Sequence, residues 1–341
     1  MNTEHVDIGV ARYSDWAFTS SVVVLVAALL LLAVELAYSR GRRVESRELV
    51  GAAAAATLGR AAAASGTSAT VGADSVTPGV VADAPKRPLD ERVGKAGLAL
   101  VYVGIGLLLV CIVLRGLATA RVPWGNMYEF INLTCFSGLV AGAIVLRKPQ
   151  YRALWVFVLV PVLILLTVSG RWLYTNAAPV MPALQSYWLP IHVSVVSLGS
   201  GVFLVAGVAS ILFLLKMSPL GQPGPESAAR RIVQRLPDAQ TLDRIAYRTT
   251  IFAFPVFGFG VIFGAIWAEE AWGRYWGWDP KETWAFISWV AYAGYLHARA
   301  TPSVKRTTAT WLAVGAWITM VINLYVINFV AVGLHSYAGV N

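Results

Sequence analysis

Six tryptophans crowd into one stretch of the sequence, between positions 267 and 289, and they are its clearest chemical signal. They are Trp267, Trp272, Trp276, Trp278, Trp284 and Trp289. An aromatic belt where a membrane meets water is the structural alternative, but a belt accounts for only one or two tryptophans at a helix end. Gly273 and Gly277 would let the backbone approach a flat ligand, and the charges of Asp279, Lys281 and Glu282 would be unfavourable against lipid. The stretch therefore predicts a site for a planar, hydrophobic ligand.

Histidine is the second signal, because the chain contains only four. His192 opens the apolar stretch 190–215, and His335 follows the apolar stretch 307–332, so both are expected at the same depth. A lone histidine at a helix end is usually a surface group, but two beside a tryptophan-rich segment indicate another role. Pairs of neutral imidazoles are common axial ligands of haem iron. We therefore predict that His192 and His335 coordinate the iron of one haem b.

His297 lies in the apolar stretch 284–299, thirteen residues after Trp284. At 1.5 Å per helical residue this places it about 20 Å from the tryptophans, so it cannot share a haem with the other pair. Contacts with Asn or Ser side chains are the structural alternative. An intramembrane histidine is nevertheless a functional candidate by default. As a haem ligand, His297 would need its second axial ligand from another polypeptide, because the remaining histidine, His5, precedes the first apolar stretch.

Four arginine and lysine side chains are candidates to pair with carboxylates of such a ligand. Arg274 and Lys281 lie within the tryptophan-rich stretch, and a guanidinium matches a carboxylate in shape and charge. Arg171 and Arg121 are weaker candidates. The alternative for all four is a solvated loop charge.

Two acidic residues have predicted structural roles. Asp279 precedes Pro280, and Asp followed by Pro suits the start of a helix, so Asp279 is expected to cap one. Glu129 is expected to pair with Arg115 rather than to act as an acid or base.

The rest of the sequence describes the helices that must position these residues. Hydrophobic residues make up 57% of the chain, charged residues 13%, and the mean hydropathy is +0.64, which excludes a soluble globule or a disordered chain. Stretches of about 20 apolar residues, enough to cross roughly 30 Å of hydrocarbon, recur along it. We predict an all-α polytopic membrane protein. Its eight spans are expected at 17–38, 96–117, 125–146, 153–170, 190–215, 249–268, 284–299 and 307–332.

Lysine and arginine are unevenly distributed over the predicted loops. Of the 27, 21 fall on the side that includes residues 39–95 and 6 on the other. Because positive residues stay on the cytoplasmic side, the asymmetry predicts that both termini are external. It also explains the net charge of +9, which in a soluble protein would suggest nucleic acid. We therefore expect contact with membrane lipid and no nucleic-acid binding.

The positions of the spans and of the segments between them divide the chain into three predicted regions. Residues 1–38 comprise an external tail and the first span, and residues 39–95, rich in Ala, Gly, Ser and Thr, predict a flexible cytoplasmic linker. Residues 96–341 form the seven-span region with the tryptophan-rich stretch. The loop at 218–245 is expected to contain a short interfacial helix. Direct use of ATP is not expected, because no phosphate-binding loop is present.

The run from Trp272 to Trp284 resembles the WWD signature of haem-handling proteins in cytochrome c maturation. It reads Trp-Gly-Arg-Tyr-Trp-Gly-Trp-Asp-Pro-Lys-Glu-Thr-Trp. Its context is similar to the CcsA/ResC branch, called CcsB in some bacteria, of the system II cytochrome c synthases. The resemblance covers about residues 95–341 and includes the motifs Asn-Met-Tyr-Glu at 126–129 and Gly-Leu-His-Ser-Tyr at 333–337.

The resemblance implies roles for the residues above. His192 and His335 would be the external axial ligands, and His297 a transmembrane ligand whose companion comes from a ResB-type subunit. The tryptophan-rich stretch would hold the face and edge of the haem. The haem-binding residues of that stretch would be Trp272, Arg274, Trp276, Trp278, Asp279, Lys281 and Trp284.

It also implies a function in cytochrome c biogenesis, in the bacterial cytoplasmic membrane or in the thylakoid membrane of a plastid. The protein would receive or export haem and present it outside, where the thiols of a Cys-x-x-Cys-His segment of apocytochrome c add to its vinyl groups. It would then be a subunit of a holocytochrome c synthase, with a thiol-reducing system keeping those cysteines reduced. Two alternatives stay open: a haem transporter or chaperone that performs no ligation, and a membrane electron-transfer subunit with bound haem or quinone.

Overall fold

The computed structural model describes residues 6–38, 89–180, 182–324, 326–327, 331 and 333–335, and all regular structure in these residues is helical. The long helices are α1 (Ile8–Tyr38), α3 (Leu89–Thr119), α4 (Met127–Val145), α5 (Leu154–Trp172), α6 (Trp188–Met217), α8 (Ala239–Trp272), α9 (Pro280–Ala300) and α10 (Arg306–Leu324). They correspond in order to the eight predicted spans. The predicted linker falls outside the described residues as far as position 88, and its last residues belong to α3.

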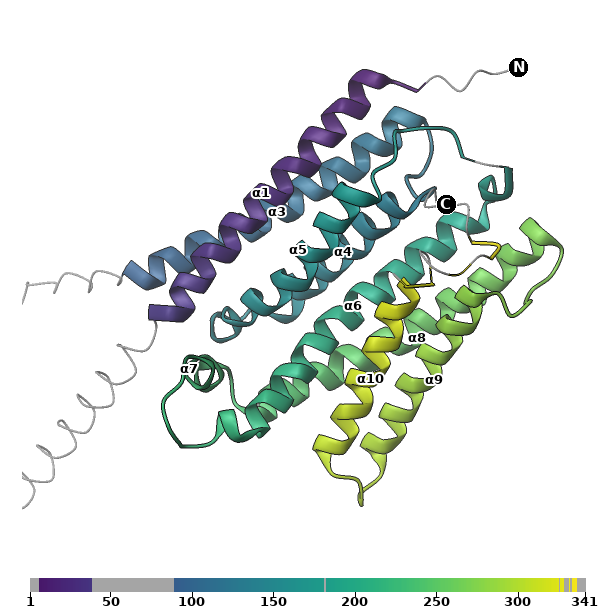
Figure 1. The fold of residues 1–341 in the computed structure, drawn as a ribbon. Helices are drawn as coiled ribbons and strands as arrows, with labels where there is room; N and C mark the ends of the chain where they lie inside the picture. The colour runs from purple at the N-terminus through teal and green to yellow at the C-terminus, as the bar shows by residue number, and fades with distance from the viewer. Residues whose placement is uncertain are drawn as a thin grey trace, which may run out of the picture.

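The prediction of a multi-pass, all-helical membrane protein is confirmed. Seven of the helices are long and apolar enough to cross a membrane, all except α9. Helix α9 carries charged residues at both ends, and it packs between α8 and α10. The short helix expected in the 218–245 loop is α7 (Ala228–Arg235), which runs across the direction of the long helices (Figure 1).

Side-chain caps fix where several helices begin. Asn126 accepts a hydrogen bond from the Glu129 amide at the start of α4, and Asp238 accepts one from the Thr241 amide at the start of α8. Helix α8 ends at Gly273, whose φ of 71° is the left-handed conformation that favours glycine. Local sequence thus sets the ends of the helices that carry the tryptophans.

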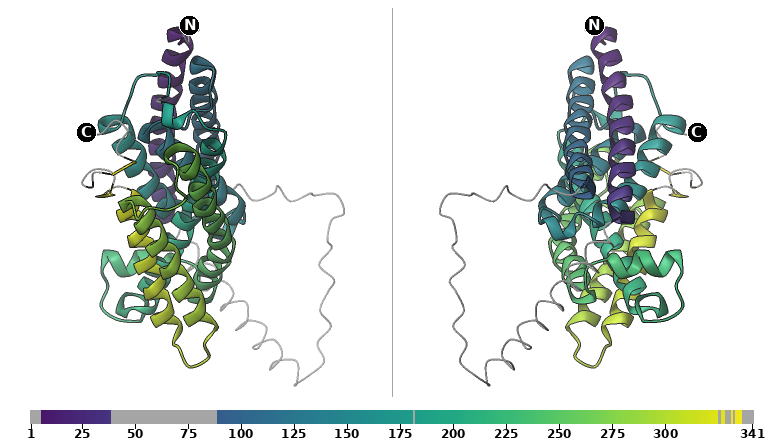
Figure 2. Two further views of the ribbon diagram at one scale, coloured as in Figure 1. Left: turned by 90° about the vertical axis from the view of Figure 1, so that its right-hand side faces the viewer. Right: turned by 90° about the vertical axis from the view of Figure 1, so that its left-hand side faces the viewer.

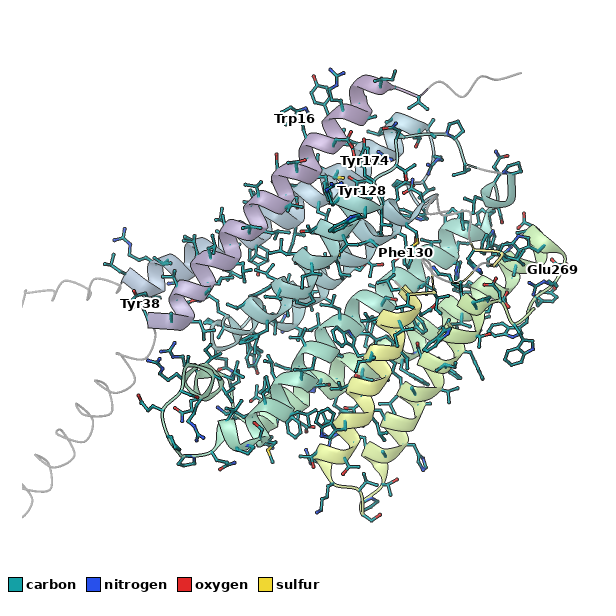
Figure 3. All side chains as sticks on the ribbon, in the orientation of Figure 1. Trp16, Tyr38, Tyr128, Phe130, Tyr174 and Glu269 are labelled. Carbon is teal, nitrogen blue, oxygen red and sulfur yellow. The ribbon has the colours of Figure 1, made fainter. Side chains whose placement is uncertain are left out.

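The long helices form two groups that lie side by side (Figure 1). Helices α1, α3, α4 and α5 pack with part of α6 and the start of α8 around one hydrophobic core, and α9 and α10 pack with other parts of α6 and α8 around another. The groups are joined where α4 crosses α6: a Cβ added to Gly201 would lie only 2.5 Å from the Gly138 amide nitrogen. Small residues allow such close helix approach in membranes. Figures 2 and 3 show the common direction of the helices and the side chains that fill the space between them.

The two ends of the bundle differ. One end, here called the tryptophan end, contains the start of α1, the α8–α9 connection and His335; the Asp7 amide there donates to the Ala118 carbonyl. The other, here called the loop end, contains α7 and the α9–α10 turn, where Asp243 accepts hydrogen bonds from Arg299 and Arg306. Helix α7 adds Arg230, Arg231 and Arg235 to the basic residues described at this end.

The orientation of the bundle is the first prediction. Reporter fusions after Ser65 and Arg230 are expected to show a cytoplasmic location, and a fusion after Asn341 an external one, because 21 of the 27 arginine and lysine residues fall on the side of the chain predicted to be cytoplasmic. Paired phosphatase and fluorescent-protein reporters measure this directly. An external signal from the Ser65 fusion would invert the topology.

Candidate ligand site at the tryptophan end

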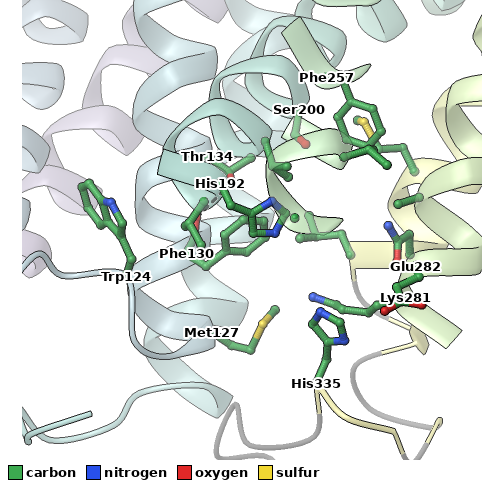
Figure 4. A pocket seen from close by; sticks show the side chains of 18 of the residues that line it. Trp124, Met127, Phe130, Thr134, His192, Ser200, Phe257, Lys281, Glu282 and His335 are labelled. Carbon is green, nitrogen blue, oxygen red and sulfur yellow. Dashed lines mark hydrogen bonds between the residues drawn. The ribbon is translucent and has the colours of Figure 1, made fainter. Parts of the chain in front are cut away.

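A cavity of about 370 Å³ lies between the two helix groups at the tryptophan end. Residues of α4, α5, α6, α8, α9 and α10 line it, and most of the lining is apolar. His192 and His335 both belong to the lining, as does Lys281 (Figure 4). The structure therefore brings together the two histidines that the sequence placed at one depth.

His192 is held firmly against α8. Its Nδ1 donates to the Gly260 carbonyl at 2.8 Å, and its ring stacks on Trp267 with ring centroids 5.8 Å apart and an angle of 13°. A Cβ added to Gly264 would lie 2.7 Å from Cε1 of the imidazole, so only glycine leaves room for the ring here. Since Nδ1 is the donor, Nε2 carries the lone pair that can bind a metal.

His335 is held in the same way by a carboxylate. Its Nδ1 lies 2.9 Å from Oδ1 of Asp279, and Oδ2 of Asp279 accepts a hydrogen bond from the Leu334 amide at 2.7 Å. Burial lowers the pKa of His335 below its usual value despite the carboxylate, so the ring is neutral at neutral pH. Burial acts to raise the pKa of Asp279, but its hydrogen bonds with His335 and with backbone amides bring it below its usual value. A neutral imidazole next to a carboxylate again places the lone pair on Nε2.

Asp279 connects this histidine to α9. As predicted, it caps the helix: its side chain accepts from the Lys281 amide, and Glu282 reaches back to the Asp279 amide in a capping box. The same carboxylate thus starts α9 and positions His335. Metal-bound histidines typically donate their second ring nitrogen to a carboxylate or a carbonyl, and both histidines of this cavity do so.

Three of the predicted tryptophans surround the histidines. Trp267, Trp272 and Trp276 line the cavity, and the rings of Trp267 and Trp272 meet the His335 ring edge to face at 5.8 and 5.3 Å. Trp267 is one of the six tryptophans of the stretch 267–289, but the sequence does not predict it as a haem-binding residue. It is 1% exposed and contacts both imidazoles, a position set by how α6 and α8 cross.

Two other predicted residues lie away from the lining. Trp278 is 68% exposed, and its φ of 57° is unusual for a bulky side chain. Its ring packs edge to face against Trp276, with centroids 5.8 Å apart, so Trp278 supports a lining residue from outside. Trp284 does not line the cavity either; its carbonyl accepts the Ser288 hydroxyl within α9.

The structure places the basic residues that could pair with carboxylates of a ligand in different surroundings. Lys281 lines the cavity, with Nζ 5.5 Å from the centre of the Phe130 ring. Arg274 instead turns back toward Glu282, 3.9 Å away, and toward Gly277. Arg121 is occupied by Glu129 and by the Ala178 carbonyl. Within the described lining, Lys281 is the cation placed to meet an anionic group.

Glu129 pairs with Arg115, as predicted, and it also pairs with Arg121. Its carboxylate binds Arg115 and Arg121 at 3.1 Å each and accepts a hydrogen bond from the Gly125 amide at 2.8 Å. Arg115 in turn donates to the Thr175 carbonyl. This buried group ties the α3–α4 turn to the 173–186 loop, and the turn contributes Trp124 and its neighbours to the cavity wall.

His297 lies outside the cavity. Its side chain is exposed on α9, near the loop end, and no described residue forms a hydrogen bond with its ring. The contacts with Asn or Ser that would make it a structural group are thus not formed within the described part of the chain. The ring faces away from the bundle, toward lipid or a partner.

Fold and site together define a polytopic helical membrane protein with an aromatic cavity that is lined by two imidazoles. The sequence model of the cytochrome c assembly protein family matches residues 124–335, so the chain belongs to this family. Proteins named cytochrome c biogenesis protein CcsA are 34% identical over 262 residues in Guillardia theta and 35% identical over 289 residues in Thermosynechococcus vestitus. These alignments cover 70% and 74% of this chain and 87% and 89% of the relatives.

A solved structure shares the fold. The cytochrome c haem lyase CcmF superposes with a TM-score of 0.58 at 17% identity, over 92% of this chain. The chain spans 46% of the length of that protein. The likeness therefore concerns the arrangement of helices.

The second prediction concerns the glycine behind His192. Gly264→Ala is expected to displace the imidazole and to weaken haem at the tryptophan end roughly tenfold, as loss of a supporting contact to a metal ligand does. Gly106→Ala in α3, where an added Cβ meets nothing within 4 Å, is the matched control. Haem titration followed by absorbance measures both. Equal haem affinity in the two variants would show that haem binding does not depend on the space that Gly264 leaves beside the His192 ring.

The third prediction separates the two tryptophans. Trp276→Ala is expected to weaken haem binding by about 1 kcal/mol or more, roughly fivefold, because it removes a ring from the cavity wall. Trp278→Ala is expected to have the smaller effect, because it removes only the ring behind Trp276. The haem-to-protein ratio after purification is the readout, with membrane insertion checked by yield. A larger loss from Trp278→Ala would place its ring against the ligand.

Proposed function

We propose that this chain binds haem at the tryptophan end through His192 and His335 and presents it for covalent attachment to apocytochrome c. The observation that carries the proposal is that both imidazoles line one cavity and that each uses Nδ1 as a donor, to a carbonyl or a carboxylate. This pattern fixes the ring orientation and leaves Nε2 for iron. A haem b in this cavity would be the substrate of the reaction.

The residues around the histidines have complementary tasks in this function. Trp267, Trp272 and Trp276 offer flat apolar surface to the porphyrin, and Lys281 offers a charge to a propionate. The protein acts by orientation: it holds the vinyl groups where the thiols of a Cys-x-x-Cys-His segment can add to them. In each addition the thiol proton moves to the terminal vinyl carbon and the sulfur bonds to the inner one.

A second membrane subunit of the ResB type would complete the machinery. His297 is exposed on α9, and a six-coordinate haem there needs a second histidine. The partner would supply it, and the haem would pass from this site to the tryptophan end.

The test is to express an apocytochrome with this chain, with and without the partner, and to stain denaturing gels for covalently bound haem. A stained cytochrome only when both subunits are present supports ligation. Haem-loaded chain that never yields stained cytochrome would favour a transporter without ligation. Haem that stays bound and cycles between redox states would favour an electron-transfer subunit.

A further inference from the structure

The cavity continues past the histidines into the middle of the bundle, and haem coordination does not require this inner part. Along α6 its lining runs from Leu189 through His192 to Leu204, which at 1.5 Å per residue is about 22 Å. Beyond His192 the wall is mainly apolar. It includes Thr134, Pro161, Ile164, Phe257, Trp317 and Met320.

This inner part follows the boundary between the two helix groups. Helix α5 packs on α1 and α4, whereas α10 packs on α6 and α9. The cavity lies between α5 and α10, and α6 forms its floor with Ser200 and Leu204, which are 6% and 4% exposed. The hydrophobic cores on the two sides are separate.

The inner part also reaches the lipid-facing surface. Ile164 lines the cavity although it is 58% exposed, so the same side chain borders both the cavity and the hydrocarbon. Pro161, one turn earlier, lines the cavity too. A proline within a helix cannot donate its backbone hydrogen bond, so α5 has one bond fewer beside the cavity. On the opposite side, Trp317 and Val321 of α10 are partly exposed.

We propose that the opening between Ile164 of α5 and Val321 of α10 is a lateral portal through which haem passes between the bilayer and the histidines. The identity of the ligand rests on the proposed function. Haem is flat and apolar except for its two propionates, so it partitions into lipid, and an apolar slot continuous with the histidines fits it. Lys281, the cation of the described lining, lies beside His335 at the end of the cavity away from this opening, where it would meet a propionate of the bound haem (Figure 4).

The portal can be tested without haem. Ser200→Cys places a thiol on the cavity floor, and Ser210→Cys places one in the core of the same helix, away from the cavity. In native membranes, the lipid-soluble reagent N-(1-pyrenyl)maleimide is expected to label Ser200→Cys at least fivefold faster than Ser210→Cys. The wild type, with buried Cys111 and Cys135, gives the background. No labelling of Ser200→Cys by this reagent, or faster labelling by a charged methanethiosulfonate from outside, would overturn the portal.

A bulky side chain at Ile164 tests whether haem and the pyrene reagent enter between α5 and α10. Ile164→Trp in the Ser200→Cys protein is expected to slow pyrene labelling at least threefold and to slow haem uptake from haem-loaded vesicles equally. Val160→Trp, one turn earlier, exposed on α5 and outside the lining, is expected to change neither. Equal rates in the two variants would exclude this opening. Pyrene labelling that haem does not prevent would refute the proposed haem site and leave the portal standing.

Discussion

Replacing His192 with glycine is expected to abolish low-spin haem at the tryptophan end and to reduce cytochrome c formation by at least about tenfold, since even supporting residues of a metal site have effects of that size. The imidazole packs against Gly264 and Trp267, and its loss leaves a hole of its own shape. Imidazole added to the medium can fill that hole. Absorption spectra of the purified protein and haem-stained gels measure loss and rescue.

His335→Gly is expected to give the same loss and the same rescue, because we propose His335 as the second axial ligand. The control is His5→Gly, which removes a histidine that precedes the first helix and is expected to change nothing. Unchanged spectra and cytochrome yield in both the His192 and the His335 variants would remove these residues as ligands. Loss that imidazole does not reverse would indicate a folding defect instead.

His297→Ala is expected to remove a second haem, and only when the partner subunit is present. The ring is exposed on α9, about 20 Å from the tryptophans by helix rise, and no described residue offers it a companion ligand. In the complex the variant is expected to lose most of the haem at the His297 site. The haem proposed at His192 and His335 is expected to stay coordinated as in the wild type. In the isolated chain, wild type and variant are expected to bind equal haem. Haem per protein, measured as the pyridine haemochrome, distinguishes these states.

Val290→Ala is the control for that experiment, because Val290 is also exposed on α9 but has no ligand atom. If it lowers haem as much as His297→Ala does, the effect belongs to the subunit interface. A full transmembrane haem in the isolated wild-type chain would contradict the need for a partner.

The sequence was sufficient to predict the helices and the depth of the histidines. The length of the apolar stretches alone predicts the spans, and the positions of His192 and His335 at the ends of spans predict their shared depth. The cap formed by Asp279 was predictable too, because an Asp-Pro pair acts through local geometry.

Contacts between helices were not predictable. Trp267 contacts the His192 ring, and Gly260 accepts the His192 proton, because α6 packs against α8 there; the contact of Trp267 with His335 depends on where the segment after α10 returns. Equally, the pattern of tryptophans could not show that Trp278 turns outward while Trp276 turns inward, since the connection between α8 and α9 has no helical period. Asp279 was expected to cap a helix, but its bond to His335 joins residues that are distant in sequence.

The separation of His192 and His335 along the chain has a consequence for biosynthesis. His192 lies in α6, whereas His335 follows α10, so four helices are synthesised between them. A nascent chain therefore inserts His192 into the membrane before His335 and its carboxylate partner can meet, since Asp279 itself begins α9. The pair of imidazoles that lines the cavity therefore exists only after the last helix has been inserted, so the proposed haem site becomes complete at the end of synthesis.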